Sequence, residues 1–207
     1  MINREEDLVI KYRDMSAHED AEYNNGAVFI AGIDEAGRGP LAGPVVAAAC
    51  ILNKDVRILG VDDSKKLSKK KREVLYSEII EKALEWSVCA VDNYVIDDIN
   101  ILNATKEAMR RCVLALKTKP DVLLIDAVDL EDTGIRVVPL IKGDAVSVSI
   151  AAASVIAKVT RDRIMVEYSE IYPGYGFEKH KGYGTKAHYD AIAKYGRTPI
   201  HRNTFLK

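Results

Sequence analysis

The chain has 207 residues, of which 48% are hydrophobic and 29% are charged, and its formal net charge is −1. These values are typical of a soluble globular protein with one sizeable domain and a substantial core. No stretch reaches the roughly 20 apolar residues of a membrane span, and the N-terminus lacks the apolar segment of a signal peptide. We therefore expect a cytoplasmic protein that does not associate with membranes.

An alternation of strands and helices is predicted after a short N-terminal extension. Residues 1–26 are polar, acidic and weakly helical, which predicts a helical or partly ordered arm without chemistry of its own, and residues 27–207 form the main domain. Runs rich in Val, Ile and Ala predict strands at 28–34, 44–52, 86–92, 121–126 and 135–140. Helical spacing of apolar residues predicts helices at 68–83, 101–117 (with Asn100 as N-cap), 148–169 and 186–195.

Two adjacent acids, Asp34 and Glu35, follow the first apolar run and precede a turn rich in Gly and Pro. Neighbouring carboxylates repel each other, and burying either one unpaired costs several kcal/mol. No Lys or Arg is adjacent to them in the apolar run. Divalent metal ions bound by carboxylate oxygens are the usual partners in such a setting.

Two further acids stand at the ends of apolar segments. Asp126 ends the predicted strand VLLID, and Asp144 precedes the long apolar helix. Strand ends and helix N-termini on one side of an α/β sheet converge on one crevice. Taken singly, Asp126 could be a turn former and Asp144 a helix cap, and Asp129, Asp132 and Asp162 are rivals for the last place. A set of four acids can hold two divalent ions about 3.5–4 Å apart, an arrangement suited to phosphodiester cleavage.

The turn Gly37-Arg38-Gly39 follows the acid pair, and its glycines permit unusual φ angles and close approach to a ligand. The simpler interpretation is a tight turn without a function of its own. Its position next to two acids favours the functional one.

Ser64 and Lys65 belong to a Lys-rich loop that leads into a helix, where an anion would satisfy both the lysines and the free N–H groups. A solvated surface loop is the alternative. Tyr183 lies between two glycines and beside basic residues, so its ring can stack on a sugar or a base, or it can simply pack. The C-terminal region from residue 178 is basic and helical.

Together, the segments at 34–46, 63–67, 154–163 and 179–185 resemble bacterial ribonuclease HII, and the resemblance covers about residues 28 to 203. It implies an α/β ribonuclease H-like fold, with a mixed five-stranded sheet flanked by helices and a helical C-terminal region. It also implies cleavage of RNA in RNA/DNA hybrids and incision 5′ of single ribonucleotides in duplex DNA. The products would be a 3′-hydroxyl and a 5′-phosphate.

The resemblance assigns catalytic and metal-binding roles to Asp34, Glu35, Asp126 and Asp144, with two Mn²⁺ or Mg²⁺ ions. It further implies that backbone groups of Gly37, Arg38 and Gly39 read the 2′-hydroxyl, that Tyr183 stacks on the next sugar, and that Ser64 and Lys65 hold phosphate. We expect a monomer that acts in ribonucleotide and RNA primer removal. The rivals are ribonuclease HIII, an integrase-like enzyme of the same fold, and a non-catalytic nucleic-acid-binding module.

Overall fold

The computed structural model of the chain describes residues 4–131 and 133–206, which form a mixed five-stranded sheet with the order β3-β2-β1-β4-β5. Strand β1 is antiparallel to β2 and parallel to β4. The strands are β1 (Ile30–Ala36), β2 (Val45–Ile51), β3 (Glu85–Val91), β4 (Val122–Asp126) and β5 (Arg136–Leu140). The predicted fold class is confirmed, and each strand end lies within two residues of its expected place.

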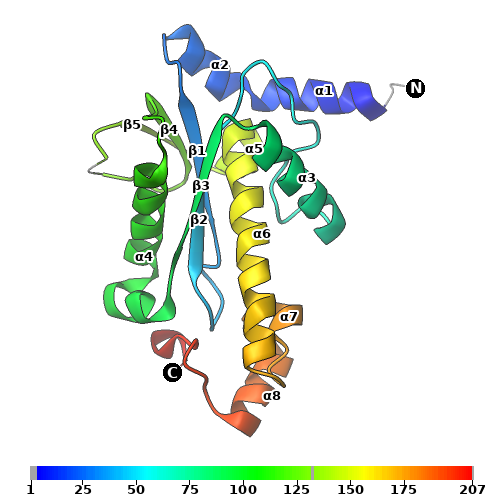
Figure 1. Cartoon of the computed structure of the whole chain (residues 1–207), viewed down its shortest axis with the longest axis vertical. Helices are drawn as coiled ribbons and strands as arrows, with labels where there is room; N and C mark the ends of the chain where they lie inside the picture. The colour runs from blue at the N-terminus through cyan, green and yellow to red at the C-terminus, as the bar shows by residue number, and fades with distance from the viewer. Residues whose placement is uncertain (1–3, 132, 207) are drawn as a thin grey trace.

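Helices cover both faces of the sheet (Figure 1). Helix α4 (Asn93–Ala115) packs on one face through an apolar stripe that includes Ala104, Ala108 and Met109. Helices α3 (Lys69–Lys82) and α6 (Val148–Ile171) pack on the other face. The first ten residues of α6 are buried all round, as the apolar run at its start predicts.

The predicted start of a helix at residue 101 matches the second segment of α4, whereas the first segment, which begins at Asn93, was not predicted. The side chain of Asp92 caps this start by accepting from the Val95 N–H at 3.0 Å. Asn100 has φ 67 and interrupts the helix, and its Oδ1 accepts from the Asn103 N–H at 3.1 Å. The capping role predicted for Asn100 is therefore present, but at a kink between two helical segments.

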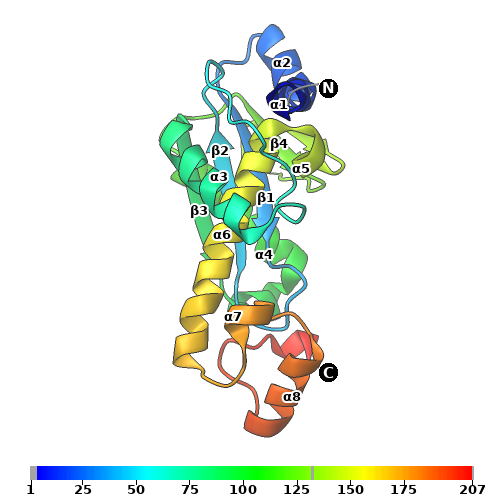
Figure 2. The same cartoon turned by 90° about the vertical axis from the view of Figure 1, so that its right-hand side faces the viewer.

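The N-terminal arm consists of α1 (Arg4–Met15) and α2 (Ala17–Asn24), which lie across the beginning of α6 (Figures 1 and 2). Met15 is buried and joins the apolar cluster of α3 and α6. The arm is helical as predicted, and it packs on the main domain. The division at residues 26 and 27 stays a prediction.

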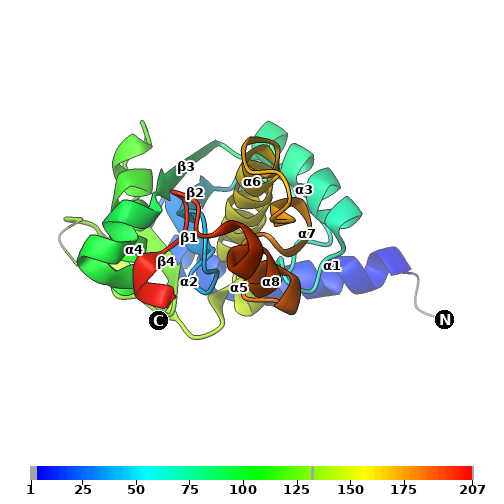
Figure 3. The ribbon, with the colours of Figure 1, turned by 90° about the horizontal axis from the view of Figure 1, so that it is seen from below.

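The C-terminal region lies at the opposite end of α6 from the arm (Figures 1 and 3). It contains α7 (Phe177–His180), α8 (Lys186–Tyr195) and the 3-10 helix Asn203–Phe205. Only α8 was expected from the sequence. The short helix α5 (Gly143–Val146), just before α6, was also not expected. No helix in the described ranges combines the length and apolar character that crossing a bilayer requires.

Helix α6 and strand β1 approach each other closely at Gly32. A Cβ built on Gly32 would lie 2.0 Å from the backbone carbonyl carbon of Ser149. Backbone atoms cannot move aside as a flexible side chain can, so a methyl group here must push the helix off the sheet. The glycine thus sets the distance between the sheet and the helix that follows Asp144.

We expect Gly32→Ala to destabilise the protein by about 3 kcal/mol or more, which corresponds to a loss of roughly 6 °C or more in Tm for a domain of this size. Thermal unfolding measures the change. Gly39→Ala is the control, because a Cβ there meets only the Tyr183 ring at 3.7 Å and Gly39 has no positive φ. Equal melting temperatures for the two variants would contradict the close approach.

Candidate active site

The two acids of β1 lie on opposite faces of the sheet. Asp34 is paired with Ala48, which faces α6, and Glu35 is paired with Ala47, which faces α4. Asp34 is only 3% exposed, and its Oδ1 accepts from the Glu35 N–H at 2.8 Å. Because successive side chains of a strand point to opposite faces, the two carboxylates lie on the two faces of the sheet at the end of β1.

Asp126 comes next to Asp34 because β1 and β4 are parallel neighbours. Ile33 pairs with Ile125, and the two acids follow directly on this pair. Asp126 Oδ1 accepts from the Gly143 N–H at 2.7 Å. Residue 143 begins α5, which also carries Asp144. One hydrogen bond thus fixes both the orientation of Asp126 and the turn that delivers Asp144.

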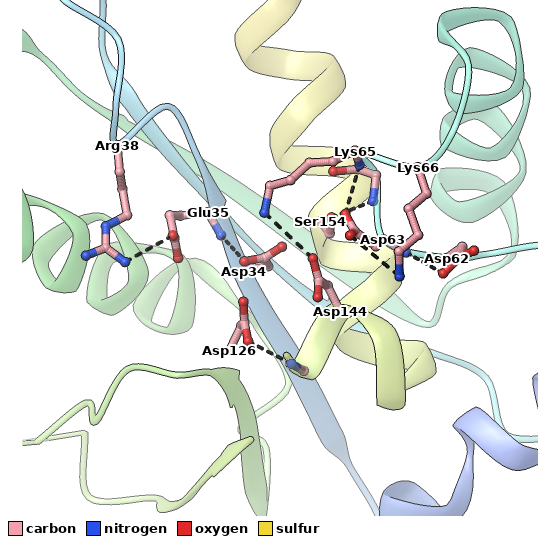
Figure 4. Close-up of polar contacts among 12 residues, drawn as sticks. Asp34, Glu35, Arg38, Asp62, Asp63, Lys65, Lys66, Asp126, Asp144 and Ser154 are labelled. Carbon is pink, nitrogen blue, oxygen red and sulfur yellow. Dashed lines mark hydrogen bonds and ion pairs between the residues drawn. The ribbon is translucent and has the colours of Figure 1, made fainter. Parts of the chain in front are cut away.

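The side chains of Asp34, Asp126 and Asp144 gather around one space, with Glu35 on its other side (Figure 4). Burial raises the pKa of Asp34 well above its usual value, and the charges of Glu35, Asp126 and Asp144 raise it further. Burial also raises the pKa of Glu35. The sequence expectation that these acids meet agrees with this placement. The rivals Asp129 and Asp162 take no part in these interactions, and Asp132 lies outside the described residues.

Two cations approach the acids from loops, although no Lys or Arg is adjacent to the acids in the apolar run. Lys65 Nζ lies 3.8 Å from Asp144 Oδ2, and Arg38 lies 3.6 Å from Glu35 Oε1. Burial lowers the pKa of Lys65, but Asp34 and Asp144 raise it, and the net direction is upward. Both cations are largely exposed, so solvent screens these pairs and leaves much of the negative charge uncompensated.

Carboxylate oxygens are the ligands that Mg²⁺ and Mn²⁺ prefer, and the donor set here fits such ions. Glu35 Oε2 is buried and has no hydrogen-bond partner, so it remains available to a cation. No three His, Cys, Asp or Glu side chains in residues 4–131 and 133–206 form a complete ion-binding group on their own. Water and a substrate phosphate would have to complete the coordination.

Asp63 is an acid of this site that the sequence analysis did not assign. Burial is the largest cause that raises the pKa of Asp144 to about 6, and the nearby charge of Asp63 raises it further. Asp63 also accepts from the Lys65 N–H at 2.9 Å and so shapes the loop that holds Lys65. Its place beside Ser64 and Lys65 was the available signal.

The turn after β1 is held from inside by two buried arginines, Arg161 and Arg202, which are 1% and 0% exposed. Arg202 donates to the carbonyls of Gly37 at 2.6 Å, Arg38 at 2.9 Å and Gly43 at 2.8 Å. Burial lowers the pKa of Arg202 to about 9. This guanidinium is stabilised by backbone carbonyls, and in return it dictates the direction of the peptide groups.

Arg161, on α6, donates to the carbonyls of Pro44, Ala42 and Lys181. It thereby ties the turn after β1 to the loop that contains Tyr183. Burial lowers the pKa of Arg161 to about 10. The sequence analysis did not assign Arg161 a role at this turn. Its spacing of four residues from both Ala157 and Met165 on the buried face of α6 was the signal.

Gly37 cannot be replaced without strain, because its φ is +96 and a Cβ would lie 1.9 Å from Arg161 Nε. Gly39 is different, since its backbone is ordinary and its neighbourhood is open towards Tyr183. The first glycine is needed for the shape of the turn. The second leaves room in front of it.

A cleft of about 760 Å³ joins the acidic end of β1 to this turn. The expected site residues that line it are Glu35, Gly37, Arg38, Gly39, Ser64, Lys65 and Tyr183. Tyr183 is 45% exposed, whereas Ser64 is 4% exposed and uses its N–H on Ser154 Oγ. The tyrosine ring is thus accessible to a ligand, and Ser64 contributes mainly to the shape of the wall.

The family model and the curated relatives agree on one family. The family model "Ribonuclease HII" matches residues 31–207. Ribonuclease HII of Clostridioides difficile is 56% identical over 91% of this chain and 74% of its own, and that of Enterococcus faecalis is 59% identical over 94% and 76%. The structure of the complex of PCNA with ribonuclease HII from Archaeoglobus fulgidus aligns with TM-score 0.76 and 32% identity, covering 87% of this chain and 96% of that one.

The acidic site should destabilise the metal-free protein at high pH. Asp144 titrates near 3.8 when unfolded and at about 6 when folded, so the folded protein retains a proton that the unfolded chain has lost between these values. Raising the pH through this window therefore lowers the stability. We expect Asp144→Asn to raise Tm at pH 8 by roughly 2–4 °C, the effect of about 1 kcal/mol in a domain of this size.

Most of the gain should disappear as the pH falls through 6 towards 4, where residue 144 is uncharged in both folded proteins. Melting curves recorded with a chelator at several pH values measure it. A gain that persists at pH 4, or a lower Tm at pH 8, would show that Asp144 is not a strained charge.

Proposed function

The chain belongs to the ribonuclease HII family and is a metal-dependent endoribonuclease, and from this premise we propose that it incises duplex DNA 5′ of single ribonucleotides as well as cleaving RNA in RNA/DNA hybrids. The observation that carries the proposal is the cleft that contains Glu35, the Gly37–Gly39 turn and Tyr183 together. Chemistry and sensing of a ribose would then take place in one groove.

Asp34, Glu35, Asp126 and Asp144 would hold two Mg²⁺ or Mn²⁺ ions. When bound, such ions supply activation of the attacking water and stabilisation of the charge on the leaving 3′-oxygen. The products would be a 3′-hydroxyl and a 5′-phosphate. The protein's own contribution is a rigid set of carboxylates. Gly143 orients Asp126 through its N–H, and burial removes the water that would otherwise solvate Asp34.

The turn would read the 2′-hydroxyl with its amide groups. In a trans peptide the C=O and the following N–H point in opposite directions. Because Arg202 holds the carbonyls of Gly37 and Arg38, the N–H groups of Arg38 and Gly39 point away from it. Two fixed donors beside the cleft suit a hydroxyl that DNA lacks.

Tyr183 would stack on the sugar that follows the ribonucleotide. Its ring is exposed in the cleft and lies next to Gly39, so the reader of the hydroxyl and the stacking surface are adjacent. Lys65 would move between Asp144 and a substrate phosphate, since its pair with Asp144 is long and exposed. Binding should accordingly weaken as salt rises.

The rival functions make different demands on this cleft. A non-catalytic binding module gains nothing from buried carboxylates, which repel the phosphate backbone. An integrase-like enzyme has no need of a donor pair fixed for a 2′-hydroxyl. The proposal further assigns the activity to a monomer that acts in the cytoplasm, in the removal of ribonucleotides and RNA primers.

The deciding experiment uses duplex DNA that contains one ribonucleotide, with the incision mapped on a sequencing gel. We expect a cut 5′ of the ribonucleotide in Mg²⁺ or Mn²⁺, a 3′-hydroxyl product, no cut with a chelator, and recovery when metal is restored. Asp126→Asn should reduce the rate at least 100-fold while the protein stays folded, because one ligand oxygen is replaced by an amide. Chelator-resistant cleavage, or near-normal activity of this variant, would contradict the assignment.

The turn can be tested separately with Gly39→Ala. We expect normal folding and a loss of roughly 10-fold or more in cleavage at a single ribonucleotide, since the added methyl group enters the space that the sugar would occupy. Rates on that substrate, together with the melting temperature, measure the effect. Unchanged cleavage would mean that the backbone at Gly39 does not approach the substrate.

A further inference from the structure

The N-terminal arm places a buried carboxylate on the segment that leads into α6. Glu19 of α2 is 4% exposed. Its Oε1 accepts from the hydroxyls of Ser147 at 2.5 Å and Ser149 at 2.6 Å and from the Ser149 N–H at 2.9 Å. The negative charge sits at the N-terminus of a long helix, where the helix dipole favours it.

These serines are connected to two of the four acids by a short stretch of backbone. Ser147 caps α6, and its N–H donates to the carbonyl of Gly143 at 2.9 Å. Gly143 in turn orients Asp126, and Asp144 follows it in α5. A movement of Ser147 would therefore shift the turn that carries Asp144 and the donor that holds Asp126.

The other helix of the arm reaches the loop on the far side of Asp144. Lys11 of α1 forms an ion pair with Asp62 at 2.5 Å. The same loop continues with Asp63, whose charge acts on Asp144, and with Lys65, which forms an ion pair with Asp144. The arm thus contacts both segments that enclose Asp144.

We infer that the N-terminal arm is a positioning element of the active site, and that Glu19 is the residue through which it acts. Glu19 does not touch the reacting atoms. It fixes the junction of α5 and α6, so that Asp126 and Asp144 stand ready to receive a divalent ion. This inference rests on the proposed metal site.

Glu22, on the same helix, provides a matched control. It is also an acid of the arm with a largely buried side chain, and it forms an ion pair with Arg136 of β5. Its partner lies at the start of β5 and not in the α5–α6 junction. Replacing Glu22 should therefore loosen the arm without reaching the metal-binding acids.

The test measures Mn²⁺ binding by titration calorimetry on the whole folded chain without substrate. We expect Glu19→Ala to weaken Mn²⁺ affinity roughly 10-fold, the lower end of the effects seen for residues that orient metal ligands. Hydrogen exchange should also show faster exchange of the Ser147 and Ser149 amides. Glu22→Ala should lower Tm but leave the affinity unchanged.

Glu19→Gln keeps an acceptor for the serines and serves if the alanine variant does not fold. We expect it to bind Mn²⁺ more weakly than the wild type, because its neutral amide holds the two hydroxyls and the helix N-terminus less strongly. Wild-type affinity in the folded Glu19 variants would overturn the inference. An equal loss of affinity in Glu22→Ala would overturn it as well, since the effect would then be general loosening.

Asp126→Asn separates this inference from the proposed function. If Asp126→Asn binds Mn²⁺ as tightly as the wild type, the proposed metal site itself is wrong. If Asp126→Asn loses binding and Glu19→Ala does not, only the role of the arm fails.

Discussion

Asp34 and Asp126 stand at the ends of neighbouring parallel strands, and burial removes much of the water that would solvate the charge of Asp34. The parallel register of β1 and β4 makes this meeting unavoidable, because both acids follow the last residues that the two strands pair. The packing of α6 against Gly32 then brings the turn with Asp144 to the same place. Burying like charges is unfavourable for folding. The surrounding hydrogen bonds and loop cations reduce that cost without removing it, which leaves the site with a strong demand for positive charge.

The turn from Gly37 to Gly39 is held by buried charges of the opposite sign, which are positive. Arg161 and Arg202 are buried cations that donate hydrogen bonds to backbone carbonyls, and these carbonyls belong to the loops that border the cleft. A buried guanidinium needs several acceptors in a fixed planar arrangement. The hydrogen bonds of Arg202 therefore fix the peptide orientations of Gly37 and Arg38. The N–H groups on the opposite side of the same peptides are fixed as a result. A buried charge, costly in itself, gives the turn a definite shape.

The sheet and the meeting of the acids could be predicted from the sequence because both follow from local patterns. Apolar runs mark strands such as Val122–Asp126, and acids at the ends of neighbouring strands in an α/β fold share one edge of the sheet. The start of α4 was missed because Asp97, Asp98 and Asn100 break the apolar spacing before residue 101. Lys65 contacts Asp144, and Arg202 contacts the carbonyls of the turn after β1. These contacts join residues that are far apart in the chain, and the periodicity of a sequence gives no information about them.

The arm was predicted as a helix without chemistry, and the contacts of Glu19 show why sequence composition alone is a poor guide to such a segment. An acidic, weakly amphipathic stretch is usually a solvated surface, and most of this one is exposed. One of its acids is nevertheless buried where three donors converge at a helix start. Since Ser147 and Gly143 are joined by a hydrogen bond, the arm and Asp126 belong to one connected polar network. Carboxylates that repel each other need fixed surroundings if they are to stay close together. The arm contacts the segments that fix Asp126 and Asp144, and so it lies where it can hold them in place.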